Sequence, residues 1–230
     1  MKSILAIEDD TEIVKLLSIL YKAPAYSFSS AYNGREGIEK ASKEYFDLII
    51  LDLMLPDMDG MEICRELREK HIRSVIMMLT SHSDEIDKVL AFELGADDYV
   101  TKPFGIRELM ARTKALLRRT EQTWQAVAEQ PQDINFRGLL IDKDKRKASI
   151  STKRLDLTPK EFDLLLLLAQ NPGKTYSRPE LLEKIWGYTF SGYEHTVTAH
   201  INRLRIKIEN DLSSPEYILT SWGVGYRFAE

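Results

Sequence analysis

Side chains able to bind a metal ion or a phosphoryl group stand directly after several short apolar segments of this 230-residue sequence. The clearest example is Asp52, which interrupts the apolar run from Leu48 to Met54 and is followed by turn-forming residues as far as Gly60. A short apolar run that ends in turn residues is typical of a buried strand. Asp52 is therefore predicted at the C-terminal end of a strand, where open α/β sheets bind their ligands.

Other candidate strands end in residues of the same kind. Glu8, Asp9 and Asp10 follow the first apolar segment, Thr80 follows the fourth and Lys102 follows the fifth. If these strands are parallel, their C-terminal ends share one edge of the sheet. Two carboxylates about 4 Å apart repel by about 4 kcal/mol at an effective dielectric of 20, and one ammonium offsets only part of this. The cluster therefore requires a proton or a divalent cation, and its oxygen ligands favour Mg²⁺.

Strand and helix patterns alternate five times in the first 120 residues. Apolar strand segments are predicted at 2–7, 26–31, 48–52, 74–79 and 99–101, and amphipathic helices at 11–22, 35–43, 61–70, 84–94 and 106–119. This alternation predicts an α/β doubly wound (βα)5 domain over residues 1–120, with a five-stranded parallel sheet covered by helices on both faces.

The pattern changes in the second half. Residues 121–131 lack a clear period and are predicted to be a linker, and residues 132–230 form a second, α+β domain. Short alternating segments at 134–157 predict an antiparallel meander. Two capping boxes, at 158–161 and 177–180, each open a helix. A third helix is expected at 194–209 and a glycine-containing hairpin at 217–228.

Composition and charge narrow the class of protein. Residues 1–120 hold 17 Lys and Arg against 21 Asp and Glu, whereas residues 121–230 hold 15 of each, so any nucleic-acid site must be a local patch. The single cysteine, Cys64, excludes an internal disulfide and a cysteine metal cluster. No apolar run approaches a membrane span, and the N-terminus becomes acidic too early for a signal peptide, so a cytoplasmic protein is expected.

Two other interpretations of Asp52 compete with the metal and phosphoryl site. A phosphatase with a DxD nucleophile motif needs a second Asp where Met54 stands, and in a purely structural interpretation the acids only cap loops. The helix at 194–209 is also ambiguous. Its apolar stripe is expected to face the core, and its opposite face carries no acid between its two ends, which fits either a DNA major groove or an ordinary surface helix.

Residues 1–120 closely resemble the CheY-like receiver domain of bacterial response regulators. The resemblance is carried by Glu8-Asp9, Asp52 in DLMLPDMDG, Thr80 in MMLTS, and Tyr99 and Lys102-Pro103 in GADDYVTKPF. It implies that Asp52 accepts a phosphoryl group from a sensor histidine kinase, with no enzyme activity beyond self-phosphotransfer and autodephosphorylation. The resemblance also implies the roles of the surrounding residues. Mg²⁺ would be held by Asp9, Asp52 and the Met54 carbonyl, and by Glu8 through water. The phosphoryl group would be bound by Thr80 and Lys102, Tyr99 would be a switch residue, and the bond before Pro103 would be cis.

The same region looks like the OmpR/PhoB subfamily, whose receivers form symmetric dimers. Lys88 would pair with Glu108, Asp98 with Arg112 and Glu93 with Lys114 across the two-fold axis. Asp97 lies among these charges, and Val89, Phe92 and Met110 would form the apolar centre. An ordinary solvated face is the alternative. His82 could tune the lifetime of the phosphoryl group, although such a loop residue is more often simply solvated.

The second domain resembles the winged helix-turn-helix output domain of the OmpR/PhoB family in LTPKEFDLLLLL, TVTAHINRLRIKI and TSWGVGYRF. The resemblance implies contacts to promoter DNA. Bases or nearby phosphates would be met by His195, Thr198, Ala199, Asn202 and Arg203, and mainly the DNA backbone by His200, Arg205, Tyr226 and Arg227. The hairpin would be a wing in the minor groove, and loop 187–192 would meet RNA polymerase.

Two residues depart from the family pattern. Asn202 and Trp222 stand where many members carry Arg, so fewer cationic contacts and a smaller salt dependence per monomer are expected. Trp222 could instead pack against the sugar edge. The whole chain is interpreted as a response regulator that is phosphorylated, dimerises and regulates transcription. The alternative is a phosphorylation-independent DNA-binding protein whose receiver serves only as a dimerisation module.

Overall fold

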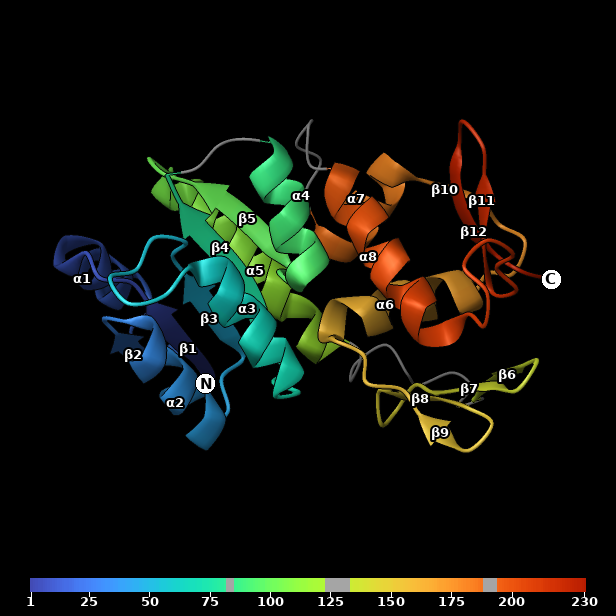
Figure 1. The fold of residues 1–230 in the computed structure, drawn as a ribbon, viewed down its shortest axis with the longest axis horizontal. Helices are drawn as coiled ribbons and strands as arrows, with labels where there is room; N and C mark the ends of the chain where they lie inside the picture. Colours follow the sequence, from blue (N-terminus) through green and yellow to red (C-terminus); the bar gives the residue numbers. More distant parts are fainter. Residues whose placement is uncertain (82–84, 123–132, 188–193) are drawn as a thin grey trace. The chain divides into compact units, whose positions relative to one another are not determined.

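The computed structural model describes residues 1–81, 85–122, 133–187 and 194–230 (Figure 1). Contacts along the chain divide it into two compact units, Met1–Thr113 and Lys114–Glu230. Three expectations fall outside the described residues: the role of His82, the linker from residue 123 onward and nearly all of the loop at 187–192.

The first unit contains the predicted parallel sheet. Its five strands lie in the order β2-β1-β3-β4-β5, and every pairing between neighbours is parallel. Helices alternate with the strands, which confirms the doubly wound architecture (Figure 1). The strands are β1 Lys2–Ile7, β2 Tyr26–Ala31, β3 Leu48–Leu51, β4 Val75–Thr80 and β5 Asp98–Thr101. The helices are α1 Thr11–Leu20, α2 Gly34–Lys43, α3 Gly60–Glu69, α4 Glu85–Leu94 and α5 Ile106–Gln122.

Burial explains why the central strands are the most apolar ones. Every residue of β3 and β4 is buried, as expected of central parallel strands covered on both faces. The edge strand β2 is only half buried, and it contains serines at 27, 29 and 30. Helix α5 continues three residues beyond its predicted end at Arg119 because the sequence there contains no Pro or Gly that would stop it.

Over its described residues from 133 onward, the second unit contains two small antiparallel sheets and three helices. The predicted meander forms a four-stranded sheet, β6-β7-β8-β9, and the predicted hairpin joins a third strand in the order β10-β12-β11. The strands are β6 Ile134–Phe136, β7 Leu139–Asp142, β8 Lys147–Ile150, β9 Lys153–Arg154, β10 Tyr176–Ser177, β11 Ile218–Ser221 and β12 Gly225–Phe228. The helices are α6 Pro159–Ala169, α7 Arg178–Trp186 and α8 Glu194–Ile208.

Both predicted capping boxes are formed. Thr158 and Ser177 each accept a hydrogen bond from the third residue of the following helix, whose glutamate, Glu161 or Glu180, bonds back to the cap backbone. Strand β10 has no signal in the sequence, because two residues cannot show an alternating pattern. Its pairing with β12 brings Gly225 so close to the carbonyl of Tyr176 that a Cβ would lie 2.0 Å from that oxygen.

The apolar stripe predicted on α8 forms part of the core. Val197, Ile201 and Leu204 are fully buried, and Ile208 is 2% exposed. Among the described helices, none has both the length and the apolar character needed to cross a bilayer.

Candidate functional site

The strand ends of the first unit bring the predicted acidic and cationic groups together. The backbone N–H of Asp52 donates to the carbonyl of Ile7 at 3.0 Å, and that of Lys102 donates to the carbonyl of Thr80 at 2.6 Å. The residues just beyond β1, β3 and β5 therefore share one edge of the sheet, although they come from distant parts of the sequence.

Three carboxylates and one ammonium meet at this edge. One oxygen each from Glu8, Asp9 and Asp52 lies within 4.8 Å of the others. Glu8 and Asp52 are 1% and 6% exposed, whereas Asp9 is exposed. The Nζ atom of Lys102 donates to both carboxylate oxygens of Glu8, at 2.9 and 2.8 Å, and to Asp52 Oδ2 at 2.7 Å. Lys102 thus joins the phosphoacceptor candidate to the buried glutamate.

The protonation equilibria of this cluster are shifted by burial and by mutual contact. Burial, together with the nearby Asp52 carboxylate, raises the pKa of Glu8 to about 7 in spite of the Lys102 ammonium. Burial alone would lower the pKa of Lys102, but its hydrogen bonds to Asp52 and Glu8 outweigh that effect and raise it. The edge therefore holds more negative charge than its one ammonium can neutralise.

The other acids in these loops have structural partners instead. Asp10 caps the N-terminus of α1 and Asp59 caps that of α3. Asp57 accepts hydrogen bonds from the N–H groups of Gly34 and Arg35, at 2.7 and 3.0 Å, and these lower its pKa. The loop-capping interpretation is therefore correct for these three acids, and it separates them from the cluster that contains Asp52.

The donor set of the cluster fits a hard divalent cation. All its ligand atoms are carboxylate oxygens, and burial, with a smaller contribution from the Asp52 carboxylate, raises the pKa of Glu8. Receiver domains generally bind Mg²⁺ at an acidic pocket of this kind. The fourth expected ligand, the Met54 carbonyl, belongs to a residue whose own N–H donates to Asp52 Oδ1 at 3.2 Å.

Backbone geometry around Asp52 is tightly constrained. A Cβ on Gly60 would lie 2.2 Å from the carbonyl oxygen of Asp52, so only glycine fits where α3 begins. Thr80 and Tyr99 are both fully buried, and the Phe92 ring lies 6.5 Å from that of Tyr99. The bond between Lys102 and Pro103 is cis, as predicted, and a second cis bond before Pro24 was not anticipated.

The second unit uses the cations of α8 differently from the prediction. Arg203 lies 3.7 Å from Glu161, and Lys207 donates to the same carboxylate at 2.6 Å. Arg205 donates through Nε and Nη2 to the carbonyl of Ile218, at 3.1 and 2.7 Å. The three cations that suggested a basic DNA-reading face thus bind neighbouring elements of their own unit.

Two further residues of the predicted DNA-contacting set are buried. His200 is fully buried, its Nδ1–H donates to the carbonyl of Thr196 at 2.8 Å, and its ring meets Trp186 edge to face at 4.8 Å. Ala199 is 5% exposed. Both positions correct the prediction, because α8 is flanked by core elements on more of its circumference than one apolar stripe suggests.

The solvent-facing part of α8 is narrower and carries less charge than the sequence predicted. His195 and Asn202 are exposed, Thr198 is half buried, and Ile206 is 66% exposed. In the hairpin, Tyr226 is buried, Arg227 is half buried and Trp222 is 90% exposed. The described surface therefore offers His195, Asn202 and Trp222 as its most accessible candidates among the predicted DNA contacts.

Comparison with known proteins agrees with both halves of this description. The family model described as "Response regulator receiver domain" matches residues 4–114, and that described as "Transcriptional regulatory protein, C terminal" matches residues 152–228. Among relatives, the alkaline phosphatase synthesis transcriptional regulatory protein PhoP of Bacillus subtilis is 43% identical over 233 residues, covering 100% of this chain and 97% of PhoP. ResD of the same organism is 43% identical over 230 residues, covering 98% and 95%.

Solved structures similar to this chain also include response regulators. The OmpR/PhoB homologue DrrB of Thermotoga maritima is 36% identical with a TM-score of 0.52, and both chains are covered in full. A RitR mutant is 28% identical with a TM-score of 0.80, also over both full chains. The chain belongs to the OmpR/PhoB family of response regulators. It is a two-component response regulator with a receiver domain and a winged-helix DNA-binding domain, and response regulators interact with histidine kinases and DNA.

Several of the residues expected at an OmpR/PhoB dimer interface form contacts inside one receiver. Arg112 is 1% exposed and lies 3.2 Å from Asp98, which is fully buried, and it bonds Glu108 at 2.8 Å. Asp97 is fully buried, where it accepts hydrogen bonds from Arg68 and from the backbone N–H of Ile76. These contacts correct the predicted role of Asp97 and place the Asp98–Arg112 pair within one chain.

The remainder of this surface is partly accessible. Phe92 is 1% exposed, so it belongs to the core of the receiver and not to an apolar dimer centre. The Nζ atom of Lys88 lies 6.0 Å from the ring centroid of Tyr99. Val89, Met110 and Lys88 are half buried, and only the predicted pair of Glu93 and Lys114 has both side chains exposed.

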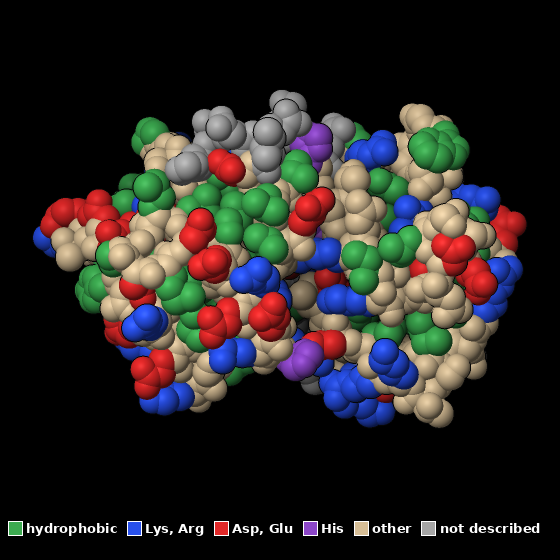
Figure 2. Space-filling model, viewed as in Figure 1, with side chains coloured by type: hydrophobic (Ala, Val, Ile, Leu, Met, Phe, Trp, Pro, Cys, Tyr) green, Lys and Arg blue, Asp and Glu red, His purple; other side chains and the backbone are tan. Residues whose placement is uncertain are grey.

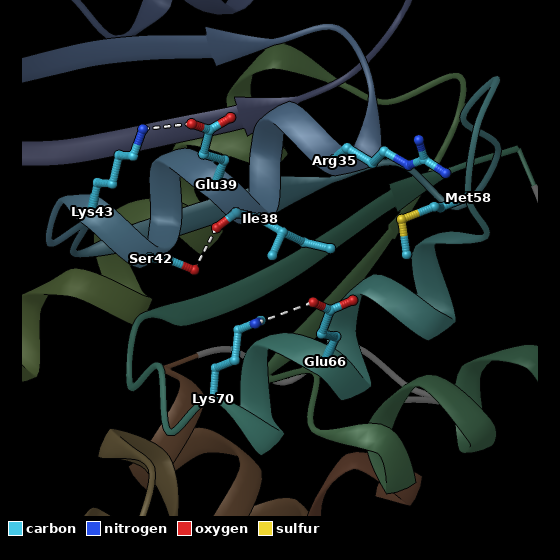
Figure 3. A pocket seen from close by; sticks show the side chains of 8 residues that line it. All are labelled: Arg35, Ile38, Glu39, Ser42, Lys43, Met58, Glu66 and Lys70. Carbon is cyan, nitrogen blue, oxygen red and sulfur yellow. Dashed lines mark hydrogen bonds and ion pairs between the residues drawn. The ribbon is translucent and has the colours of Figure 1, made fainter.

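A hollow of about 600 Å³ opens between α2 and α3 of the receiver (Figure 3). Ile38 and Met58 line its apolar part, and the Glu39–Lys43 and Glu66–Lys70 ion pairs border it. Asp52 and Lys102 do not line this hollow. Figure 2 shows charges of both signs interspersed over the receiver surface in this view, without a single-sign field.

Proposed function

We propose that Asp52 accepts a phosphoryl group from a sensor histidine kinase, and that the phosphorylated protein dimerises and binds promoter DNA. The observation that supports this most strongly is the position of Lys102, whose ammonium contacts Asp52 Oδ2 and Glu8 at a strand edge crowded with carboxylates. Such an arrangement holds a carboxylate nucleophile beside a cation able to bind phosphoryl oxygens.

The transfer step uses one oxygen of Asp52 as the nucleophile. That oxygen forms a bond to phosphorus while the bond between phosphorus and the kinase histidine nitrogen breaks, and the electron pair returns to the imidazole. Glu8, Asp9, Asp52 and the Met54 carbonyl would hold Mg²⁺, which neutralises phosphoryl charge when bound. Lys102 binds a phosphoryl oxygen, and the Thr80 hydroxyl donates to another.

The added group then acts as a switch. A phosphoryl group brings about −1.5 to −2 charge and strong hydrogen-bond acceptors. Thr80 moves toward it, and Tyr99, already fully buried beside Phe92, is retained in its inward orientation. Converting a receiver from 1% to 99% active requires about 5.5 kcal/mol of preference for the active form.

Dimerisation would use the accessible part of the surface that includes α4 and α5. Glu93 and Lys114 are both exposed and would pair across the two-fold axis, with Val89 and Met110 near its centre. We expect Glu93→Lys or Lys114→Glu to weaken the phosphorylated dimer, because each places like charges opposite one another. Combining the two changes restores opposite charges. Sedimentation of all three variants tests the pairing, and equal dimerisation of all three would remove it.

DNA binding would place the exposed side of α8 in a major groove. His195, Thr198 and Asn202 remain the proposed base-facing residues, while Trp222, Arg227 and Tyr226 belong to the adjacent hairpin. An RNA polymerase contact through the loop after Gly187 stays a prediction. Half-sites about one helical turn apart would allow the two protomers to bind in tandem.

The central experiment is incubation with acetyl phosphate and Mg²⁺, followed by intact-mass measurement. We expect one added phosphoryl group on the unaltered chain, none on Asp52→Asn, and none when Mg²⁺ is replaced by a chelator. Asp57→Asn is the matched control, because that acid lies in the same loop but accepts hydrogen bonds from the N–H groups of Gly34 and Arg35 at the start of α2. An unaltered chain that gains no mass would favour the alternative of a phosphorylation-independent DNA-binding protein.

A further inference from the structure

The hollow between α2 and α3 has the size and the lining of a small-molecule site. Its volume of about 600 Å³ falls in the range of roughly 300–1,000 Å³ that ligand pockets occupy. Ile38 is 8% exposed and Met58 is half buried, and Figure 3 shows both side chains in the space between the two helices. An apolar surface therefore lies in a hollow that is bordered by charged side chains, which suits a ligand with an apolar body and one polar group.

The charged residues of the hollow leave one cation without an acid on its own helix. Three cations and two acids line the hollow: Arg35, Lys43, Lys70, Glu39 and Glu66. Lys43 is paired with Glu39. Lys70 lies 3.4 Å from Glu66. Arg35 has no such pair among the described residues, where its hydrogen bond comes from its backbone N–H. Its guanidinium is therefore the group of the hollow that can bind an anion.

The surrounding acids leave this guanidinium available. The carboxylate of Asp57 accepts hydrogen bonds from the backbone N–H groups of Gly34 and Arg35, not from the guanidinium. A second hollow of about 460 Å³ shares Met58 with the first, and acids exceed cations in its lining. These charged residues are Glu62, Glu66, Glu69, Arg65 and Lys70. An anionic group is repelled by that excess of acids and attracted to the start of α2.

Met58 connects the hollow to the phosphoacceptor loop. It belongs to the segment between Asp52 and α3, which is closed on itself by a β-bridge between Met54 and Asp59. A Cβ on Gly34 would lie 3.1 Å from the Cβ of Met58, so the start of α2 packs closely against this segment. A group bound against Met58 therefore acts on the loop that carries the Met54 carbonyl.

We propose that the hollow binds an aromatic carboxylate, with its ring between Ile38 and Met58 and its carboxylate on Arg35, and that this ligand orders the loop at 54–59. A thioether makes favourable contacts with an aromatic ring, and a guanidinium can donate two parallel hydrogen bonds to a carboxylate.

The part of the proposal that concerns the loop rests on the function proposed above, in which the Met54 carbonyl binds Mg²⁺. A ligand that orders this loop lowers the conformational cost of binding the ion, so the two should bind with positive cooperativity.

The experiment is calorimetric titration of the full-length chain, without Mg²⁺, with two probes. One is 3-phenylpropionate, and the other is 3-phenylpropanol, which has the same ring and carbon chain but no charge. We expect the carboxylate to bind about tenfold more tightly, the scale of one charge-assisted hydrogen-bonded contact. Equal affinity for the two probes, or binding of neither, would overturn the site.

Three variants locate the bound probe. Arg35→Gln should bind both probes with the affinity that the unaltered chain has for the alcohol. Arg107→Gln is the matched control and should keep the preference, because Arg107 is the exposed second residue of α5, as Arg35 is of α2, and lies outside the lining of the hollow. Ser42→Trp, at an exposed position of the lining, fills the hollow and should abolish binding of both probes. A preference retained in Arg35→Gln, or binding retained in Ser42→Trp, would contradict the proposal.

The coupling to the loop is measured by repeating the 3-phenylpropionate titration at saturating Mg²⁺. We expect about fivefold tighter binding, and the affinity for Mg²⁺ should rise by the same factor at saturating probe, since coupling is reciprocal. Unchanged affinities would overturn the coupling. A chain that binds the probe but gains no phosphoryl mass from acetyl phosphate overturns the proposed function and not the hollow. A phosphorylated chain that binds neither probe overturns the hollow and not the proposed function.

Discussion

The acidic edge of the receiver and the reading helix of the DNA-binding domain place their polar residues by different means. At the receiver edge, Asp52 and Lys102 lie just beyond strand ends, so the backbone of a parallel sheet delivers them to one place. On α8, the position of a polar residue along the helix does not predict its partner, because Arg203 and Lys207 both contact one buried acid, Glu161.

This difference determines where a charged residue in the sequence can be taken as evidence for a binding site. Carboxylates at neighbouring strand ends have few partners other than one another, a cation or a ligand. Cations on an amphipathic helix have many, including backbone carbonyls such as those of Asp156 and Ile218. A run of Arg and Lys on a helix is therefore evidence for DNA binding only after its internal partners are known.

The largest loss of stability that would test this difference between the receiver edge and α8 is expected on replacement of Glu161. This side chain is fully buried, and although burial opposes its ionisation, Arg203 and Lys207 lower its pKa. Glu161→Ala leaves two cations facing the core without their acid, which should cost about 3–5 kcal/mol. Urea unfolding followed by tryptophan fluorescence, to which buried Trp186 contributes, measures the loss, while phosphorylation at Asp52 should be unchanged. A loss of stability below about 1 kcal/mol would show that Arg203 and Lys207 do not depend on Glu161 as an internal partner.

The next effect concerns the receiver. Replacement of Lys102 by Met removes the only ammonium that contacts both Glu8 and Asp52 among the described residues. We expect phosphorylation by acetyl phosphate with Mg²⁺ to slow by about 10²–10³-fold, the usual cost of losing one electrostatic donor. Lys43→Met is the matched control, because Lys43 is an exposed lysine on α2, and its rate should match that of the unaltered chain.

A pH dependence follows from the raised pKa of Glu8, which is about 7. Between pH 4.5 and 7 the folded chain keeps a proton that the unfolded chain releases, so stability without a cation falls as pH rises through this window. Mg²⁺ must displace the same proton, so its affinity should fall up to tenfold per pH unit below 7. Calorimetric Mg²⁺ titrations from pH 5.5 to 8 measure this, and Glu8→Gln should flatten the curve.

The smallest effect compares the two capping boxes. Thr158 is 6% exposed and caps α6, whereas Ser177 is half buried and caps α7. We expect Thr158→Ala to cost about 1 kcal/mol, and Ser177→Ala less, because water can replace the lost bond at the more exposed cap. Thermal unfolding of both variants measures the difference, and an equal loss at both caps would contradict the role assigned to burial.

The sequence predicted most of the fold and the edge cluster because strong local signals agree with one another. The five apolar runs, the two capping boxes and the glycine-containing hairpin are each read from neighbouring residues. The sequence did not predict the burial of side chains whose partners lie far away along the chain. His200 and Asp97 were assigned to surfaces, yet Trp186 and Arg68 bury them. The two-residue strand β10 exists only through its pairing with β12.

Asp57 ties the loop after the phosphoacceptor to the beginning of α2 through two backbone N–H groups. Chimeric regulators that exchange residues 52–60 alone would separate this acid from the two N–H groups beside Asn33 that it accepts in this chain. Grafts intended to transfer the input properties of one receiver to another should therefore move both segments as a single cassette.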